Sequence, residues 1–566
     1  MREADSHSIA GSRSQSVRGP AVLRPWQREA VQCWDSAGRP ADYLAEATPG
    51  AGKTHFALHL ARRELESRAA GSVSLICPTT HLRSQWQAAA HRAGIEVCTE
   101  IAGSYLDRAY QGAALTYQQV VAEPSRYRRS LGGGFAVLDE CHHMGEGKSW
   151  ADALNEAFGG ASHRLSLSGT AFRSDGCRIP FVRYDENGVS IADYRYGYAE
   201  ALRDCVVRPV YFVSFGGETI WYRGGRKMQA EFGQALSRED AAARLRTALD
   251  PAGGWMAHVL RRAHQRLTSI RHHGHDDAGG LVVCMDQTHA RRVAELLRRL
   301  TGSTPAMALS DDPHASAVIA EYAGGRKEWI VAVRQVSEGT DIPRLRVGLW
   351  ATNTTTELFF RQVVGRLVRV VPGLLEQDAY LYLPADPQLL RHARSLAEER
   401  SHSIPGPQGE ENDLPRVPAA PTTEPDFRAL GSTAGEGEVV AGSHVIAPAE
   451  LTRAVQIAGS CGLALTDPLP FALALREAAH GGATCDLPVE AIRRGLRSFL
   501  SRRVREFCAR SGSSHKEAYA RLKRQTGKPV SRLNEAALCR HVQTVNGWIE
   551  RHCGSASEPE QTANSA

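Results

Sequence analysis

The segment Ala47-Thr-Pro-Gly-Ala-Gly-Lys-Thr54 decides the expected fold, because its residue types are those of a phosphate-binding loop at the start of a helix. Glycines let the backbone wrap closely around phosphates, so that consecutive N–H groups point at them. The lysine reaches the β- and γ-phosphates, and the hydroxyl binds Mg²⁺. Since the first position is Ala47 and not glycine, the segment is a variant form, and a glycine-rich turn before a lysine is the alternative. The residues expected to bind nucleotide are Thr48, Gly50, Ala51, Gly52, Lys53 and Thr54.

A second segment, Phe135-Ala-Val-Leu-Asp-Glu-Cys-His-His143, is typical of an apolar strand that ends in two adjacent carboxylates. Asp139 at the strand end is expected to hold Mg²⁺, and Glu140 to polarise an attacking water as general base. An isolated Asp-Glu pair is often only a solvated strand end. Downstream of a phosphate-binding loop, the pair favours a Mg²⁺-nucleotide site.

Short apolar runs alternate with longer amphipathic stretches along much of the chain. Runs rich in Val, Ile and Leu that are bounded by turns predict buried parallel strands, and the stretches at 54–69 and 288–300 predict helices between them. Strands that alternate with helices predict parallel α/β sheets, in two domains. The six runs are 74–78, 135–138, 164–167, 281–285, 329–333 and 347–351.

Charge and cysteine content exclude some classes of site. The 566 residues include 68 Lys or Arg and 62 Asp or Glu, a net charge of +6, which permits a polyanionic partner without requiring one.

The 12 cysteines form no CxxC pair, which argues against a zinc ribbon or a four-cysteine cluster and predicts reduced thiols in a cytoplasmic protein. Residues 1–20 are polar, and no apolar run approaches a membrane span, so neither a signal peptide nor a membrane anchor is expected.

The composition changes towards the C-terminus. Residues 401–445, rich in proline, glycine and acidic residues, predict a flexible linker, and residues 446–566 predict a helical domain. Residues 491–540 hold 14 Lys or Arg against 3 Glu, a local charge of +11. This stretch is either a solvated helical face or a surface that contacts phosphates.

Asp139-Glu-Cys-His142 resembles the DExH box of superfamily 2 helicases and translocases, and other segments follow in the order of that family. Within the superfamily, the chain looks most like the DNA-directed branch of repair helicases, restriction-type motor subunits and phage helicases. The similar segments are Leu23-Arg-Pro-Trp-Gln27, Cys77-Pro-Thr-Thr-His-Leu-Arg-Ser-Gln-Trp86, Leu115-Thr-Tyr-Gln118, Ser168-Gly-Thr-Ala-Phe-Arg173, Ser337-Glu-Gly-Thr-Asp-Ile-Pro343 and Gln362-Val-Val-Gly-Arg-Leu-Val-Arg369.

The resemblance implies two RecA-like domains that share one site for ATP and Mg²⁺. Gln362, Arg366 and Arg369 recur at intervals of four and three, which predicts one helix face. Guanidinium groups on that face would act as arginine fingers, although an isolated helix of this kind is as often a solvated basic face. The resemblance assigns adenine recognition to Gln27, further ATP contacts to Gly339 and Asp341, coupling to His142, Ser168 and Thr170, and nucleic-acid contacts to Thr79, Arg83 and Thr116.

The expected function is ATP-driven movement along nucleic acid, with DNA favoured over RNA. An RNA helicase and an ATP-regulated clamp or scaffold that does not unwind are the alternatives. No nuclease constellation is evident, so a partner protein such as a nuclease or a repair or defence subunit is expected to cut if cleavage occurs. The expected domains are a disordered N-terminus at 1–20, an ATP-binding RecA-like domain at 21–205, a connector and second RecA-like domain at 206–400, the linker at 401–445 and the helical domain at 446–566.

Overall fold

The computed structural model resolves the chain into two compact units, one of residues up to Glu46 with Gly52–Arg195, the other of Ala47–Ala51 with the residues from Tyr196 onward. The structure describes residues 22–101, 103, 105–141, 148–169, 178–186, 189–272, 274–309, 312, 314–333, 342–371, 374, 377–398, 427–441, 444–460, 463, 468–478 and 489–554. Within this described part, no helix is both long and apolar enough to cross a membrane.

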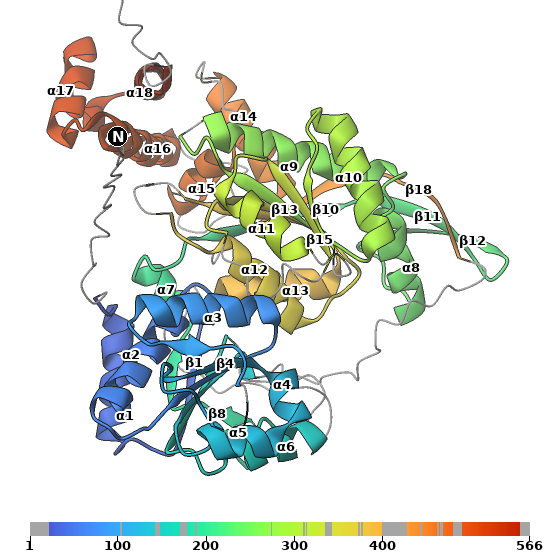
Figure 1. The fold of residues 1–566 in the computed structure, drawn as a ribbon. Helices are drawn as coiled ribbons and strands as arrows, with labels where there is room; N and C mark the ends of the chain where they lie inside the picture. The colour runs from blue at the N-terminus through green and yellow to red at the C-terminus, as the bar shows by residue number, and fades with distance from the viewer. Residues whose placement is uncertain are drawn as a thin grey trace, which may run out of the picture. The chain divides into compact units, whose positions relative to one another are not determined.

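The first unit is built on a seven-stranded sheet with the order β3-β4-β2-β5-β6-β1-β9 (Figure 1). Strands β4, β2, β5, β6 and β1 pair in parallel along this order. Up to Tyr196 the elements are α1 (Pro25–Ser36), β1 (Asp42–Ala47), α2 (Lys53–Glu66), β2 (Val73–Cys77), α3 (Thr80–Arg92), β3 (Val97–Cys98), β4 (Gly112–Thr116), α4 (Tyr117–Ala122), α5 (Pro124–Leu131), β5 (Phe135–Asp139), α6 (Lys148–Phe158), β6 (His163–Ser168), β7 (Arg183–Tyr184), β8 (Ser190–Ile191) and β9 (Tyr194–Tyr196).

Alternate residues of the buried strands supply two core layers in this unit. Phe135 on β5 contacts Trp34 of α1 on one face of the sheet, at 6.1 Å between ring centroids. Ala136 and Leu138 of the same strand join a cluster with Leu154 and Phe158 of α6 on the other face. Because both faces are covered, β5 is buried along its whole length and is apolar up to Asp139, as is typical of parallel sheets.

The second unit contains an eight-stranded sheet with the order β14-β15-β13-β16-β17-β10-β19-β20. Strands β14 to β10 in this order pair in parallel, and β19 and β20 are added antiparallel. Its elements up to residue 400 are α7 (Tyr198–Arg203), β10 (Val210–Gly216), β11 (Glu218–Arg223), β12 (Arg226–Glu231), α8 (Arg238–Ala248), α9 (Gly254–His272), β13 (Gly279–Cys284), α10 (Gln287–Thr301), β14 (Ala306–Ala308), α11 (Ala315–Gly324), β15 (Trp329–Val333), β16 (Leu345–Ala351), α12 (Glu357–Leu367), β17 (Ala379–Pro384) and α13 (Pro387–Glu398).

The predicted fold class, two RecA-like α/β domains followed by C-terminal helices, is confirmed. The six apolar runs are β2, β5, β6, β13, β15 and β16, and each pairs in parallel with a neighbour. The two predicted helices are α2 and α10. These predictions were accurate because strands buried on both faces are rich in apolar residues.

The predicted flexible linker at 401–445 is wrong for its second half. The described residues there form β18 (Arg428–Ser432), β19 (Gly435–Ala441) and the start of β20 (His444–Ile446). Val439 and Val440 on β19 are 3% and 1% exposed, so this strand is part of the core and not a solvated tether. The many glycines and acidic residues of 401–445 favoured a linker prediction. The few apolar residues of β19 gave no clear strand pattern, although they are buried.

The predicted C-terminal helices are present, and their apolar side chains join those of the second α/β sheet in one continuous buried cluster. Phe471 and Phe499, for example, pack at 5.5 Å between ring centroids. These helices therefore share a core with the second unit. They are α14 (Pro448–Ser460), α15 (Leu469–Ala478), α16 (Val489–Ser511), α17 (His515–Thr526), the short helix η4 (Val530–Arg532) and α18 (Glu535–Gly554).

The burial of β19 leads to a stability prediction. Val440→Asp places an unpaired carboxylate in the core opposite Phe212, and we expect a loss of about 3 kcal/mol or more. The unfolding temperature of the second unit, measured by calorimetry, should fall by about 4 °C or more. Val455→Asp is the control, because Val455 lies on α14 and is 49% exposed. Equal behaviour of the two variants would contradict the assignment of β19 to the core.

Candidate active site

The candidate site lies along the edge of the first sheet where its parallel strands end. Strands β1, β6, β5, β2 and β4 are parallel neighbours, so their carboxyl ends meet at this one edge. The phosphate-binding loop follows β1, and Asp139 and Ser168 are the last residues of β5 and β6. Thr116 ends β4, and Thr79 follows β2 closely. The sheet topology thus gathers predicted site residues that are far apart in the sequence.

The phosphate-binding loop has the backbone that its sequence predicts. Gly50 and Gly52 have φ values of 82° and 97°, in the left-handed region that favours glycine. A Cβ on Gly52 would also lie only 3.0 Å from the side-chain amide of Gln27. Helix α2 begins at Lys53, directly after the loop. The loop therefore leads directly into a helix N-terminus, the end of a helix that favours a bound anion.

Gln27, predicted to recognise adenine, is 1% exposed and bonded to this loop. Its Nε2 donates a hydrogen bond to the Gly52 carbonyl oxygen at 2.9 Å, and its Oε1 accepts one from the Arg24 N–H at 2.8 Å. The side chain thus connects the start of α1 to the phosphate-binding loop. Adenine recognition stays a prediction for this residue.

The carboxylate of Asp139 is held by a tryptophan. Trp86 on α3 donates a hydrogen bond from Nε1 to Asp139 Oδ2 at 2.8 Å, and the Glu140 N–H donates to Oδ1 at 3.1 Å. The Tyr117 hydroxyl donates to the backbone oxygen of Asp139 at 2.9 Å. Burial, reinforced by the nearby Glu140, raises the pKa of Asp139 to about 7, although Lys53 and the Trp86 hydrogen bond oppose the shift.

Lys53 and Glu140 form an ion pair beside this carboxylate, with Nζ and Oε1 3.5 Å apart. Glu140 has a φ of 48°, which a residue with a Cβ rarely adopts. Such strained backbone persists only where the surrounding structure imposes it, and it concentrates at functional sites. The side chains of Lys53 and Glu140 are 10% and 28% exposed, so the pair is accessible from one side.

This donor set fits a magnesium nucleotide. Mg²⁺ is usually held by one or two carboxylates together with phosphate oxygens and waters. Asp139 is a buried carboxylate, and burial raises its pKa. Thr54 offers a hydroxyl on the first turn of α2. These two residues would hold the ion, with the nucleotide supplying the remaining oxygens.

The predicted nucleic-acid contacts form a second polar group at the same edge. Thr79 and Thr116 cap the N-termini of α3 and α4, accepting hydrogen bonds from the N–H groups of Leu82 and Gln119. Gln119 Oε1 in turn accepts from Arg83 at 3.0 Å and from the Thr116 N–H at 2.8 Å. Gln119 connects Arg83 to Thr116, and it was not predicted from the sequence.

Some predicted residues cannot be placed. His142, Thr170, Gly339 and Asp341 lie outside the described residues. Ser168 is described, and it is fully buried at the end of β6.

In the second unit, the prediction that Gln362, Arg366 and Arg369 share one helix face is wrong for Arg369. Helix α12 ends at Leu367, so Gln362 and Arg366 lie on it four residues apart, whereas Arg369 forms an isolated β-bridge with Val207. The spacing of the three residues continues the helical pattern up to Arg369. However, α12 ends at Leu367, where a residue distant in the sequence bonds to its last carbonyl groups.

That residue is Arg208, which is 2% exposed. Its backbone N–H donates to the Val368 oxygen at 2.7 Å, and its guanidinium Nε donates to the Leu367 oxygen at 2.6 Å. A second guanidinium nitrogen donates to the Pro343 oxygen at 2.9 Å. The bonds to Leu367 and Val368 satisfy carbonyl groups that are left open where α12 ends. Arg208 therefore positions the segment that carries Arg366 and Arg369.

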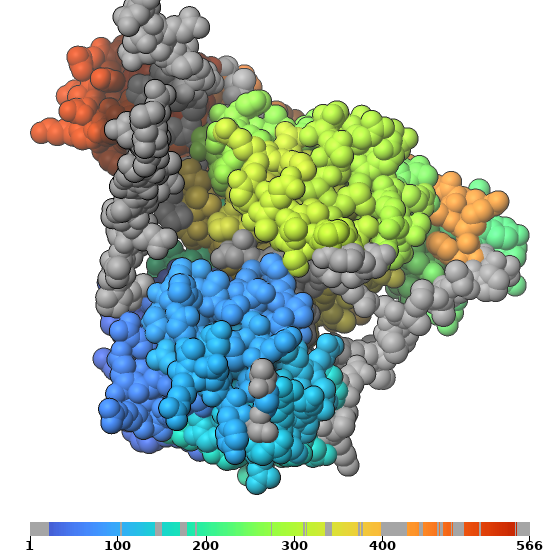
Figure 2. Space-filling model, in the orientation of Figure 1, coloured from blue at the N-terminus to red at the C-terminus, as the bar shows by residue number. Residues whose placement is uncertain are grey.

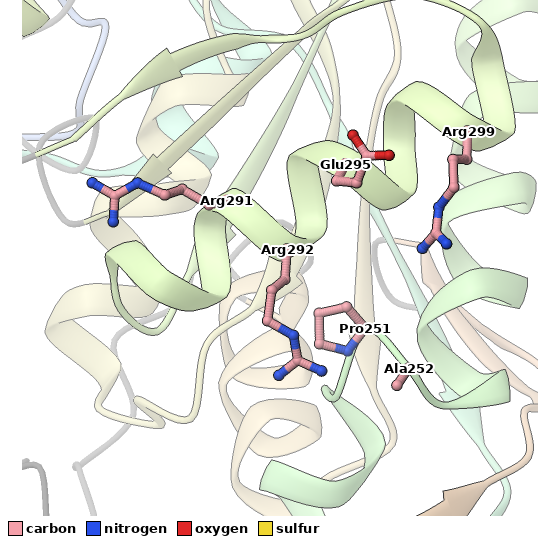
Figure 3. Close-up of a pocket in the computed structure, with 6 residues that line it drawn as sticks. All are labelled: Pro251, Ala252, Arg291, Arg292, Glu295 and Arg299. Carbon is pink, nitrogen blue, oxygen red and sulfur yellow. The ribbon is translucent and has the colours of Figure 1, made fainter.

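A separate surface hollow of about 340 Å³ lies beside α10 in the second unit (Figure 3). Arg292 pairs with Asp250 at 2.6 Å, and Glu295 with Arg298 at 2.8 Å. None of the predicted site residues contributes to this hollow. Its lining residues are Pro251, Ala252, Arg291, Arg292, Glu295 and Arg299.

The hydrogen bond from Trp86 gives a testable prediction. Trp86→Phe keeps an aromatic ring but removes the donor to Asp139. Trp34→Phe is a matched control, because Trp34 is also fully buried and its Nε1 has no hydrogen-bond partner among the described residues. We expect Trp86→Phe to cost about 1.5–3 kcal/mol more than the control in urea unfolding of the first unit. Equal losses in the two variants would show that the hydrogen bond contributes nothing.

Comparison with known proteins shows which proteins this chain is similar to. Residues 21–173 match the family model described as "Type III restriction enzyme, res subunit". Among solved structures, the DNA-bound ATP-dependent Type ISP restriction-modification enzyme LlaBIII aligns with a TM-score of 0.45 at 12% identity, over 97% of this chain and 44% of that one. Dbp5 of S. cerevisiae, bound to RNA and ADP BeF3, aligns with a TM-score of 0.42 at 13% identity, over 66% of this chain and 87% of that one.

The uncharacterized protein Rv2917 of Mycobacterium tuberculosis is 44% identical to this chain over 436 residues, which are 74% of this chain and 72% of Rv2917. The family match over residues 21–173 confirms the helicase-like domain that the motifs predicted. The chain therefore belongs to the protein family of Rv2917, and it carries a superfamily 2 helicase-like ATPase domain of the res-subunit type.

Proposed function

We propose that this protein is an ATP-dependent translocase or helicase that acts on DNA. One observation carries the proposal: the Lys53 amine lies 3.5 Å from the Glu140 carboxylate and beside Asp139, where the phosphate-binding loop and the end of β5 meet. A protein that only binds nucleotide does not need a second carboxylate at this position. ATP hydrolysis does need one, to orient and polarise water.

Each residue at the sheet edge has a distinct role in the proposed reaction. Lys53 leaves its ion pair with Glu140 and contacts the β- and γ-phosphates, which frees the Glu140 carboxylate to accept a proton from the attacking water. Bound Mg²⁺ would supply positive charge to the phosphate oxygens, with Thr54 and Asp139 as its protein ligands. Trp86 keeps the Asp139 carboxylate in one orientation.

The second unit contributes Arg366 and Arg369 in this proposal. A guanidinium group placed against the transferring phosphoryl group stabilises the charge that develops in the transition state. The buried Arg208 holds the backbone from which both residues project. The helical turn of α12 orients Gln362 and Arg366, and the β-bridge to Val207 orients Arg369.

Two regions, one polar and one basic, are proposed to hold the nucleic acid. The group formed by Thr79, Arg83 and Thr116 would contact phosphates at the edge of the first sheet. The exposed Lys516, Arg521, Lys523 and Arg524 of α17 would add sequence-independent, salt-sensitive contacts. The preference for DNA over RNA is supported by the motif resemblance and by the restriction-enzyme description of the matching family. Cleavage would require a separate nuclease.

The role of Glu140 can be tested by one isosteric change. Glu140→Gln keeps the size of the side chain but removes the base, so we expect ATP turnover to fall by about 10²- to 10⁴-fold with little change in ATP affinity. Turnover is measured with and without single-stranded DNA, and affinity by titration with a fluorescent ATP analogue. Glu66→Gln is the control, because Glu66 lies on the exposed end of α2. DNA-stimulated turnover at the wild-type rate in Glu140→Gln would exclude Glu140 as the base.

A further inference from the structure

A small sheet in the second unit has no part in the proposed ATPase chemistry. It has the order β12-β11-β18, and it joins two segments of the chain that are about 200 residues apart. Strands β11 and β12 form a hairpin whose turn residues Gly224 and Gly225 have φ values of 55° and 76°. Two positive φ angles are typical of a tight two-residue hairpin turn. The hairpin and β18 lie at the edge of this unit, beside α8 (Figure 1).

The two faces of this sheet differ. Trp221 on β11 and Ala230 on β12 face α8 and pack with its Ala243, each 3% exposed or less. The next residue, Tyr222, points to the opposite face because side chains alternate along a strand, and it is 38% exposed. Leu430, at the irregularity in the pairing of β18 with β11, is 42% exposed. In the space-filling view, β18 lies at the surface beside β11 and β12 (Figure 2).

Tyr222 is flanked by cations on both neighbouring strands. Its register partner on β12 is Lys227, and its register partner on β18 is Arg428. Residues directly opposite in antiparallel strands have Cβ atoms about 5 Å apart, so the three side chains form one row across the sheet. Lys227 and Arg428 are both exposed.

This row is not paired within the described part of the chain. Lys227, Arg428 and the adjacent Arg226 take part in no ion pair there, and the Tyr222 ring in no aromatic contact. Arg223 differs, because it points towards α8 and pairs with Glu239 at 2.6 Å and Asp240 at 3.1 Å. The acidic residues of the hairpin, Glu218 and Glu231, are register partners at the end away from the turn, four residues along each strand from the row. The exposed row is therefore positive and has an aromatic ring at its centre.

We propose that Tyr222, with Lys227 and Arg428 on either side, is a stacking platform for an unpaired base of single-stranded nucleic acid. Every base has a π-face that stacks on an aromatic ring, and the flanking cations match the phosphates on either side of the stacked base. A duplex does not fit this row, because its bases are already stacked on one another. The platform would let the protein bind an exposed single strand. That its ligand is nucleic acid rests on the proposed function.

The test measures binding of the full-length protein, without ATP, to a fluorescein-labelled oligothymidine and to an abasic phosphodeoxyribose strand of equal length. We expect Tyr222→Ala to weaken oligothymidine binding about 5- to 100-fold, because one base loses its stacking partner. Tyr222→Phe keeps the ring and should bind within about 2-fold of wild type. The abasic strand should not distinguish wild type from Tyr222→Ala. Lys227→Gln with Arg428→Gln should lower the salt dependence for both strands.

Two controls, the variant Tyr105→Ala and ATP turnover without nucleic acid, test whether the effect is specific to Tyr222. Tyr105→Ala removes a tyrosine of the first unit that is 78% exposed, and it should leave binding unchanged. ATP turnover without nucleic acid should be the same in all these variants. Oligothymidine binding by Tyr222→Ala at the wild-type level, or an equal loss on the abasic strand, would overturn the platform. Absence of ATP turnover in the wild-type protein would instead overturn the proposed function, since the binding assay uses no ATP.

Discussion

The hydrogen bond from Trp86 to the buried carboxylate of Asp139 is the interaction on which the candidate site depends. A carboxylate loses hydration when it is buried, and this raises the pKa of Asp139 to about 7. The indole N–H at 2.8 Å and the Glu140 N–H at 3.1 Å offset part of that cost. In the proposed site, a bound Mg²⁺ would compensate the remainder of that cost.

The hydrogen bonds of Asp139 also account for the strained backbone of the next residue, Glu140. Glu140 must leave the end of β5 and turn its carboxylate towards Lys53, and its φ of 48° is the result. The fixed hydrogen bonds of Asp139, together with the Tyr117 hydroxyl on its backbone oxygen, hold the chain in this conformation. In the second unit Arg208 has a comparable role, because its buried guanidinium ends α12 and directs the backbone towards Arg369.

Local patterns in the sequence predicted much of the fold and of the site. The phosphate-binding loop, the Asp-Glu strand end and the apolar strands each depend on neighbouring residues, so their positions were predicted correctly. Interactions between distant segments were not. The family resemblance of the segment 77–86 gave no indication that Trp86 would bond to Asp139. The helical spacing of Gln362, Arg366 and Arg369 gave no indication that Arg208 would bond to the end of α12. Strand β19 was missed because few of its residues are apolar, although Val439 and Val440 are buried. The row of Lys227, Tyr222 and Arg428 becomes visible only when the register of three strands is known.

The central claim, that the chain couples ATP hydrolysis to DNA, is tested most directly by the ATP turnover of the intact protein. Turnover is measured alone and in the presence of single-stranded DNA, duplex DNA and RNA at equal nucleotide concentration. We expect a low basal rate that rises several-fold with at least one form of DNA and less with RNA. A rate that does not respond to any of the three nucleic acids would contradict it.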